Sequence, residues 1–242
     1  MKIIGIIPAR FDSTRFPGKP LIEIGGKTMI QRVVEQCQKS KLLDKIVVAT
    51  DDERIFDHVT GIGYNAVYTS KSHQSGTDRC AEVARQFLDY EIVVNIQGDE
   101  PFIHPEQIDE GIRILLENSE FDIATLCHKV EKNEDLFNPN IIKVVKNTAQ
   151  KALYFSRSPI PFVRGFEQKD WLTKTTFYKH VGLYIFHNIV LSELTNLPMS
   201  NLEKTESLEQ LRWLEAGFDI GIGETSYESF SIDTPEDLLK IS

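Results

Sequence analysis

The chain opens with KIIGIIPARFDSTRFPGKPL (residues 2–21), an apolar run followed by a basic loop. Ile3–Ile7 is apolar at consecutive positions apart from Gly5, which predicts a strand buried on both faces, as in a parallel sheet. The runs DKIVVATDD (residues 44–52) and EIVVNIQGDEP (residues 91–101) have the same character. Helix-period segments lie between the three runs, so the sequence predicts an α/β fold with right-handed crossovers.

Apolar residues recur at helical spacing in four segments, residues 27–40, 53–59, 75–89 and 105–118. The third segment places one apolar stripe on Cys80, Val83, Ala84, Phe87 and Leu88. After about residue 120 the pattern predicts strands over 121–130, 141–147, 151–157 and 178–186, one helix over 202–217, and a last helix with Pro235 in its first turn. No linker poor in apolar residues divides the chain, so we expect residues 1–242 to form a single domain.

The chain has 242 residues and a formal net charge of −9. This acidic balance argues against general binding to nucleic acid or anionic membranes, which usually requires a basic face. The cysteines Cys37, Cys80 and Cys127 are odd in number and widely spaced, which favours reduced core thiols over disulfides or a zinc site. The apolar run after Lys2 ends at Ala9 without a signal cleavage site. We therefore expect a cytoplasmic protein with no nucleic-acid or membrane partner.

The loop after the first strand is basic in an acidic protein. Arg10 and Arg15 offer forked donors, Lys19 a point charge, and Gly18 a close backbone approach, which together suit a polyphosphate. The loop matches neither the P-loop nor the G-x-G-x-x-G pattern. Three solvated surface cations are the alternative interpretation.

Polar side chains also follow the other two predicted strands, at Asp51–Asp52 and at 97–100. Because ligands of open α/β sheets bind beyond the carboxyl ends of the strands, we expect these groups to form one site. Asp99 beside a phosphate loop suggests Mg²⁺, which prefers oxygen ligands and shares substrate phosphates. A turn aspartate bonded to its own backbone is the alternative for Asp99, and a helix N-cap is the alternative for Asp233.

Other candidates have equally plain alternatives when taken alone. His180 lies in an apolar strand and could be a satisfied core histidine. Glu209 and Gln210 lie off a leucine stripe formed by Leu208, Leu211 and Leu214 and could be surface residues. Arg157, which precedes two prolines, could serve in an ion pair.

Taken together, the motifs resemble one family. IPARFDSTRFPGKPL, VATDD, HQSGTDR, NIQGDEP, ALYFSRSPIPF, KHVGLY, ESLEQLR and IDTPEDL occur in the order found in CMP-KDO synthetases, the 3-deoxy-manno-octulosonate cytidylyltransferases. The resemblance spans essentially the whole chain. The first motif is shared with CMP-sialate synthetases, whereas QGDEP together with YFSRSPIP and LEQLR is highly specific.

The resemblance implies a fold and an activity. The fold would be a Rossmann-like nucleotidyltransferase with a mixed, mostly parallel sheet and a small sugar-binding and dimerisation subdomain within residues 151–215. The activity would be the coupling of CTP to the acid sugar KDO, giving CMP-KDO and pyrophosphate for lipopolysaccharide biosynthesis. The family needs Mg²⁺ and works as a homodimer, so the resemblance implies both here.

The same resemblance assigns roles to residues of this sequence. The nucleotide would be bound by Arg10, Ser13, Arg15, Lys19, Ser75, Gly76, Thr77, Arg79 and Gln97. Asp99 and Asp233 would hold Mg²⁺ and would be catalytic together with Arg15 and Lys19. The sugar acid would be bound by Arg157, His180, Tyr184, Glu209 and Gln210.

Three alternatives stay open at the level of sequence. A nine-carbon sialate is a rival substrate that the sugar-side motifs disfavour, and an amino-substituted KDO is a closer one. A non-catalytic nucleotide-binding protein is the rival from another class, and the presence of both Asp99 and Asp233 argues against it. Ser231 stands where family members often have Gly, which is tolerated unless the backbone has a positive φ there.

Overall fold

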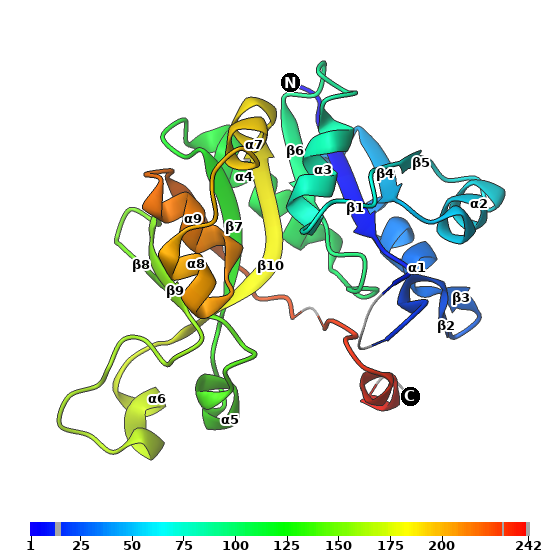
Figure 1. Ribbon diagram of the computed structural model, residues 1–242. Coiled ribbons are helices and arrows are strands. Elements are labelled where there is room, and N and C mark those ends of the chain that lie inside the picture. Colours follow the sequence, from blue (N-terminus) through cyan, green and yellow to red (C-terminus); the bar gives the residue numbers. More distant parts are fainter. Residues whose placement is uncertain (13–15, 229, 241–242) are drawn as a thin grey trace.

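The computed structural model describes residues 1–12, 16–228 and 230–240. Within them nine strands form one mixed sheet of order β11-β7-β10-β6-β1-β4-β5, with β8 paired to β10 and β9 to β8 (Figure 1). These strands are β1 (Ile3–Ala9), β4 (Lys45–Thr50), β5 (Ala66–Tyr68), β6 (Ile92–Asn95), β7 (Ile123–Lys129), β8 (Lys143–Lys146), β9 (Ala152–Ser156), β10 (Tyr178–His187) and β11 (Ile220–Glu224). A separate small hairpin joins β2 (Glu23–Ile24) to β3 (Lys27–Thr28).

Strands β1, β4, β5 and β6 are parallel, and so are β7 and β11. Strand β10 is antiparallel to both β6 and β7, and it joins the two parallel groups. The predicted α/β fold with a mixed, mostly parallel sheet is therefore confirmed. Because β7 and β6 flank the same antiparallel strand, their carboxyl ends point the same way.

Helices cover both faces of this sheet, as the consecutive apolar residues of β1 require. Ile4 and Ile6 belong to the core beneath α3 (Gly76–Ala84), α7 (Asn188–Leu194) and α9 (Glu209–Glu215), and Ile3 and Ile7 to the core beneath α1 (Met29–Cys37), α2 (Glu53–Gly61) and α4 (Pro105–Glu117). Cys37, Cys80 and Cys127 are free and buried, as predicted. Burial raises the pKa of the Cys127 thiol to about 12, so the thiol stays protonated.

Two local predictions were wrong, and a third was right in place but not in helix type. The expected helix over residues 202–217 is broken into α8 (Asn201–Glu206) and α9, because Ser207 takes a left-handed conformation with φ 52° and Leu208 is extended. The break frees backbone carbonyls, and Arg157 donates to those of Glu206 at 2.5 Å and Ser207 at 3.2 Å. Leu88 is 77% exposed because α3 ends before it, at Ala84. The last helix begins at Pro235 as predicted, but it is the 3-10 helix η3 (Pro235–Lys240) and not an α-helix.

The segment after β9 leaves the body of the molecule. It carries η2 (Gln168–Asp170) and α6 (Trp171–Lys174), and it projects beside α5 (Asn133–Phe137) in Figure 1. Trp171 and Phe177 pack with Val130 and Leu136 in a small core of their own. We call residues 158–177 the arm. Among the described residues, no helix is long and apolar enough to cross a membrane.

Gly221 in β11 tests how tightly the sheet packs on α4. A methyl group there would lie 2.5 Å from Phe121 Cδ2 and 2.8 Å from Ile114 Cγ2. We expect Gly221→Ala to lower the free energy of unfolding by about 1–3 kcal/mol, the usual cost of overpacking. Gly61→Ala is the matched control, because nothing lies within 4 Å of that position. Urea titration followed by circular dichroism would measure both, and equal stabilities would contradict the packing described here.

Candidate functional site

The carboxyl ends of β1 and β6 and the start of α3 meet around Pro8. A side-chain carbon at Gly98 would lie 2.7 Å from the Pro8 carbonyl oxygen, and one at Gly76 would lie 3.2 Å from Pro8 Cγ. The loop after β6 and the first turn of α3 therefore both rest on the end of β1. Gly98 is required in QGDE because any side chain would strike backbone. The polar segments that follow separate strands thus adjoin one another, as the sequence predicts.

Lys19 joins the two aspartates expected to bind metal. It is the first residue of the 3-10 turn η1 (Lys19–Leu21), which follows Gly18 with φ 71°. Its Nζ lies 2.7 Å from Asp99 Oδ2 and 3.4 Å from Asp233 Oδ1. Its side chain is only 14% exposed. Residues separated by 80 and 214 positions are therefore held around one ammonium group.

Asp233 reaches this place on the strap, which we define as residues 225–228 and 230–233, between β11 and η3. Tyr227 stacks on His104 with ring centroids 3.7 Å apart, and its carbonyl accepts a hydrogen bond from Gln107 Nε2 at 2.9 Å. Ile232 is buried, and its N–H donates to the Asp99 carbonyl at 2.9 Å. The strap is thus tied to the loop that carries Asp99.

Two details of this end of the chain bear on the sequence predictions. Ser231 is not among the described non-glycine residues with positive φ, so a serine is accommodated there. The turn at η3 is closed by Asp237, whose Oδ2 accepts from the N–H groups of Asp233 and Thr234, each at 3.0 Å. The Asp233 carboxylate is then directed to Lys19.

Asp99 and Asp233 are suitable ligands for a hard divalent cation. Carboxylate oxygens are the donors that Mg²⁺ prefers, and it is usually held by one or two carboxylates with substrate phosphates and water completing its shell. No group of three or more His, Cys, Asp or Glu side chains arranged for a metal occurs in the described part of the chain. The pair therefore suits a cation shared with a bound phosphate.

Arg10 is the first residue of the basic loop that follows β1. Its Nη2 donates to the carbonyl oxygens of His73 and Ser75, the latter at 3.3 Å. Burial lowers the pKa of its guanidinium, with a further contribution from Arg79. Arg15 and Ser13 lie outside the described residues.

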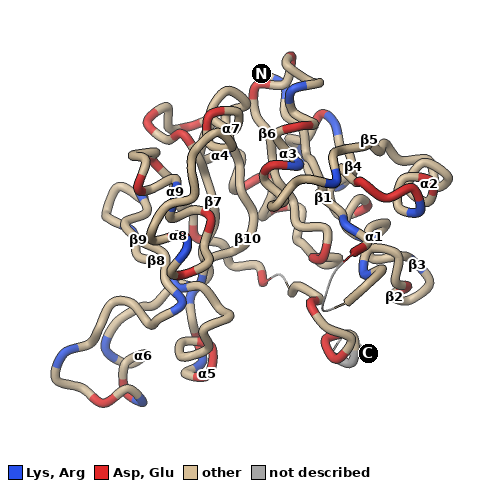
Figure 2. Tube along the Cα trace, in the orientation of Figure 1, with Lys and Arg blue, Asp and Glu red and all other residues tan. Residues whose placement is uncertain are grey.

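Figure 2 shows that the acidic residues are spread over both halves of the chain, with basic residues between them.

Arg79 is turned into the protein. Its guanidinium is fully buried, donates to Asp51 Oδ2 at 2.9 Å, and also bonds Thr69 Oγ1. The contacts of Arg79 with Asp51 and Thr69 join α3 to the ends of β4 and β5. Arg79 thus supports the first turn of α3 from below, where Ser75 and Asp78 form a capping box.

The residues expected to bind nucleotide and sugar meet at Thr77. Its hydroxyl donates to Glu209 Oε2 at 2.6 Å, and Arg212 Nη2 donates to Glu209 Oε1 at 3.0 Å. Burial raises the pKa of the Glu209 carboxyl. Arg212 was missed by the sequence reasoning, although it closes the motif LEQLR. Gln210 follows and is 5% exposed.

Tyr184 and His180 extend this surface along β10. Tyr184 is 8% exposed, and its ring meets Trp213 edge-on with centroids 5.0 Å apart. The His180 ring lies 5.1 Å from that of Tyr184 and 5.2 Å from that of Phe155. Gln97 comes close by, because its Cγ lies 3.7 Å from the Cβ position of Gly182. Residues from both halves of the chain therefore line one continuous region.

Arg157 lies at the edge of this region. Besides the carbonyls of Glu206 and Ser207, its guanidinium donates to the Pro139 carbonyl at 3.0 Å. Its own N–H donates to Glu206 Oε2 at 2.9 Å. The side chain therefore anchors the break between α8 and α9.

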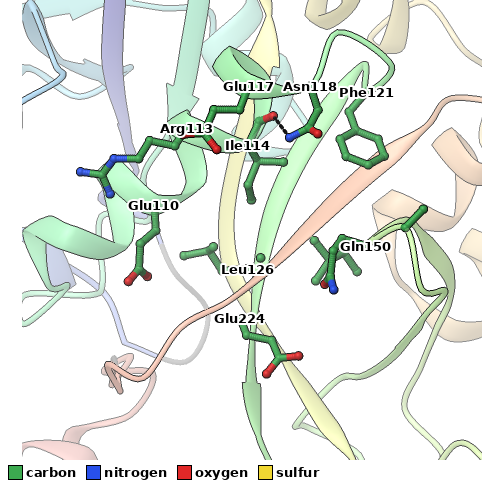
Figure 3. A pocket seen from close by; sticks show the side chains of 12 residues that line it. Glu110, Arg113, Ile114, Glu117, Asn118, Phe121, Leu126, Gln150 and Glu224 are labelled. Carbon is green, nitrogen blue, oxygen red and sulfur yellow. Dashed lines mark hydrogen bonds between the residues drawn. The ribbon is translucent and has the colours of Figure 1, made fainter.

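A cavity of about 420 Å³ opens elsewhere, at the β11 edge of the sheet (Figure 3). Its lining comes from α4 and the segment after it, from β7 and β11, and from the turn at Gln150, and it includes Ile114, Phe121 and Glu224. None of the predicted site residues that the structure describes lines it. The candidate site is defined by converging polar groups and not by this hollow.

The chain is similar to several known proteins. The family model described as cytidylyltransferase matches residues 4–221. The 3-deoxy-manno-octulosonate cytidylyltransferase of Parabacteroides distasonis is 54% identical over 99% of this chain and 96% of its own length. The protein of the same name from Bacteroides thetaiotaomicron is 52% identical, over 98% of this chain and 96% of its own length.

One solved structure is similar along the whole chain. It is described as CMP:2-keto-3-deoxy-manno-octonic acid synthetase complexed with CTP, and it is 41% identical with a TM-score of 0.93. The match covers 100% of this chain and 97% of that one.

His180 provides a pH test of the site. Burial lowers its pKa from 6.5 to about 3. The unfolded state binds a proton at His180 more readily than the folded state does. The contribution of neutral His180 to the free energy of unfolding is therefore fully present above pH 6.5 and is lost as the pH falls towards 3. Between pH 7.5 and 4.5, we expect the wild type to lose about 2 kcal/mol more stability than His180→Gln, after allowance for partial exposure. Urea unfolding at both pH values checks this, and identical losses would show that His180 titrates normally.

Proposed function

Because the chain belongs to the family of 3-deoxy-manno-octulosonate cytidylyltransferases, we propose that it transfers the cytidylyl group of CTP to KDO. The anomeric hydroxyl oxygen of KDO attacks the α-phosphorus in line, the bond to the β-phosphate bridge oxygen breaks, and the hydroxyl proton passes to solvent. The products are CMP-KDO, used in lipopolysaccharide biosynthesis, and pyrophosphate. The observation that carries the proposal is the meeting of Asp99, Asp233 and Lys19 around one point.

The residues of the chain supply binding, orientation and charge. Lys19, with Arg15, offsets the negative charge that grows on the leaving oxygens, the largest effect such a site has. Asp99 and Asp233 would hold Mg²⁺, which supplies charge stabilisation and a lower pKa for the attacking hydroxyl. Holding two substrates in line contributes about 7–11 kcal/mol of barrier reduction, so no covalent enzyme intermediate is needed.

The two substrates occupy adjoining parts of the site. Arg10, Ser75, Gly76, Thr77 and Gln97 bind the nucleotide, together with Ser13. Arg79 acts from beneath this turn, because its guanidinium is enclosed. The acid sugar lies against Arg157, His180, Tyr184, Glu209 and Gln210. The hydrogen bond between Thr77 and Glu209 supports this arrangement, because it joins one residue of each proposed set.

The protein acts in the cytoplasm as a homodimer, with the dimer contact in the subdomain within residues 151–215. The exposed aromatic residues of the arm support this assignment, since Phe162 is 74% and Phe166 50% exposed. Exposed aromatic side chains of this kind are typical of protein interfaces.

Loss of one carboxylate tests the catalytic role of Asp99. We expect Asp99→Asn to keep the fold but to lower turnover at least ~100-fold, the scale of a lost electrostatic stabiliser. Asp89→Asn is the matched control, because Asp89 is exposed and pairs with Lys2 far from the site. Pyrophosphate release is the measurement. Near-normal release by Asp99→Asn would remove Asp99 from the mechanism.

A substrate panel tests the proposed reaction itself. With CTP and Mg²⁺ we expect pyrophosphate release with KDO and none with sialate, and EDTA should abolish the reaction because the metal shares the substrate phosphates. An amino-substituted KDO in the same panel would show whether it is the preferred sugar. Binding of CTP without release for any acid sugar would instead indicate a nucleotide-binding protein.

A further inference from the structure

Thr125 carries a fully buried hydroxyl in the apolar strand β7. It lies opposite an irregularity in β10, where Val181 pairs with Leu126 but Tyr184 pairs with Thr125. Gly182 and Leu183 are looped out between these two pairs. The sequence gives little sign of this arrangement, since a single threonine in an apolar strand is common.

Three groups of β10 surround the Thr125 hydroxyl. Its Oγ1 lies 2.7 Å from the Leu183 carbonyl oxygen, 3.2 Å from that of Val181, and 2.9 Å from His180 Nε2. The two carbonyls belong to the looped-out turn. The hydroxyl therefore replaces the partner that β7 would otherwise supply through its backbone.

The single proton of the Thr125 hydroxyl determines which ring nitrogen of His180 is protonated. A threonine hydroxyl has one proton to donate, and a carbonyl oxygen can only accept. At 2.7 Å the Leu183 and Thr125 oxygens require the proton between them, because two lone pairs at that distance repel. Nothing is then left for the hydroxyl to donate to His180, so Nε2 must carry its own proton and donate to Oγ1.

The other ring nitrogen is available to a ligand. Nδ1 has no hydrogen-bond partner within residues 1–12, 16–228 and 230–240, and the His180 side chain is only partly buried, so this nitrogen is not committed to another group of the protein. The rings of Phe155 and Tyr184 flank the imidazole. Burial disfavours the charged ring, which agrees with a neutral imidazole carrying one proton.

We propose that Thr125 is a positioning residue that holds His180 as the neutral Nε2–H tautomer, so that Nδ1 accepts a hydrogen bond from a hydroxyl group of the acid sugar. The proposal rests on the proposed function for the identity of the ligand. His180 then contributes no positive charge to binding the sugar carboxylate. It recognises a hydroxyl, and Thr125 sets the direction of that hydrogen bond from the far side of the ring.

The experiment compares Thr125→Val, which keeps the shape and removes the hydroxyl, with Thr125→Ser, which keeps the hydroxyl. Imidazole ¹⁵N NMR at pH 7.5, with the His180 signal assigned from His180→Gln, reports the tautomer in the free protein. We expect a protonated Nε2 and an unprotonated Nδ1 in the wild type and in Thr125→Ser. Thr125→Val should lose this fixed tautomer.

Steady-state kinetics are the second readout. For Thr125→Val we expect KM for KDO to rise about tenfold while KM for CTP changes less than about twofold, because one hydrogen bond to the sugar is misdirected. Thr125→Ser should restore KM for KDO. A parallel rise in both KM values would show a merely structural role and overturn the proposal.

The NMR measurement separates failure of this inference from failure of the proposed function. A wild-type spectrum with protonated Nδ1 overturns the inference even if KDO is a good substrate, and it decides the matter should Thr125→Val not fold. Unchanged tautomer in a folded Thr125→Val also overturns it. If the tautomer is as expected but no KDO is turned over, the proposed function fails, and the hydroxyl assigned to Nδ1 fails with it.

Discussion

The ion pairs of Lys19 with Asp99 and Asp233 are the constraint on which the site depends. Two carboxylates held close together repel, and a cation between them offsets that repulsion where solvent access is limited. Lys19 is 14% exposed and reaches both. A polyphosphate and a divalent cation would offer the same three groups new partners of opposite charge. Lys19 thus offsets only part of the charge of the two carboxylates, and the remaining negative charge suits a divalent cation.

Strand β10 is what lets one site use both halves of the chain. It lies antiparallel between β6 and β7, so Tyr184 sits beside Asn95 at the end of the nucleotide half. The shift in register between β10 and β7, which falls between Val181 and Tyr184, then changes the direction in which the side chains of β10 point. His180 and Tyr184 can face the same region as Thr77 only because of this arrangement. The strap performs the equivalent task for Asp233 by crossing back to the loop of Asp99.

The sequence was sufficient for the central strands of the sheet, because these strands are rich in apolar residues, and it indicated where Lys19 and Asp99 meet, because polar residues follow β1 and β6. It was insufficient where a distant contact decides the local structure. The helix over residues 202–217 has no internal breaker, and Ser207 interrupts it at a place where Arg157 binds the carbonyls. Leu88 fits a helical stripe, yet the helix has ended before it. The spacing of apolar residues in the sequence shows neither the break at Ser207 nor the end of α3 before Leu88.

The same limit applies to the cations, where residue type alone overstates the charge that a substrate would meet. Arg79 is fully buried against Asp51, so its charge is already paired inside the protein. Arg157 gives three guanidinium hydrogen bonds to backbone carbonyls. Arg79 is therefore a support for the turn that carries Ser75, whereas Arg157 supports the turn before Glu209 from a position beside the proposed sugar site. A motif indicates that an arginine is needed, and only the contacts show whether it holds the ligand or the loop beneath it.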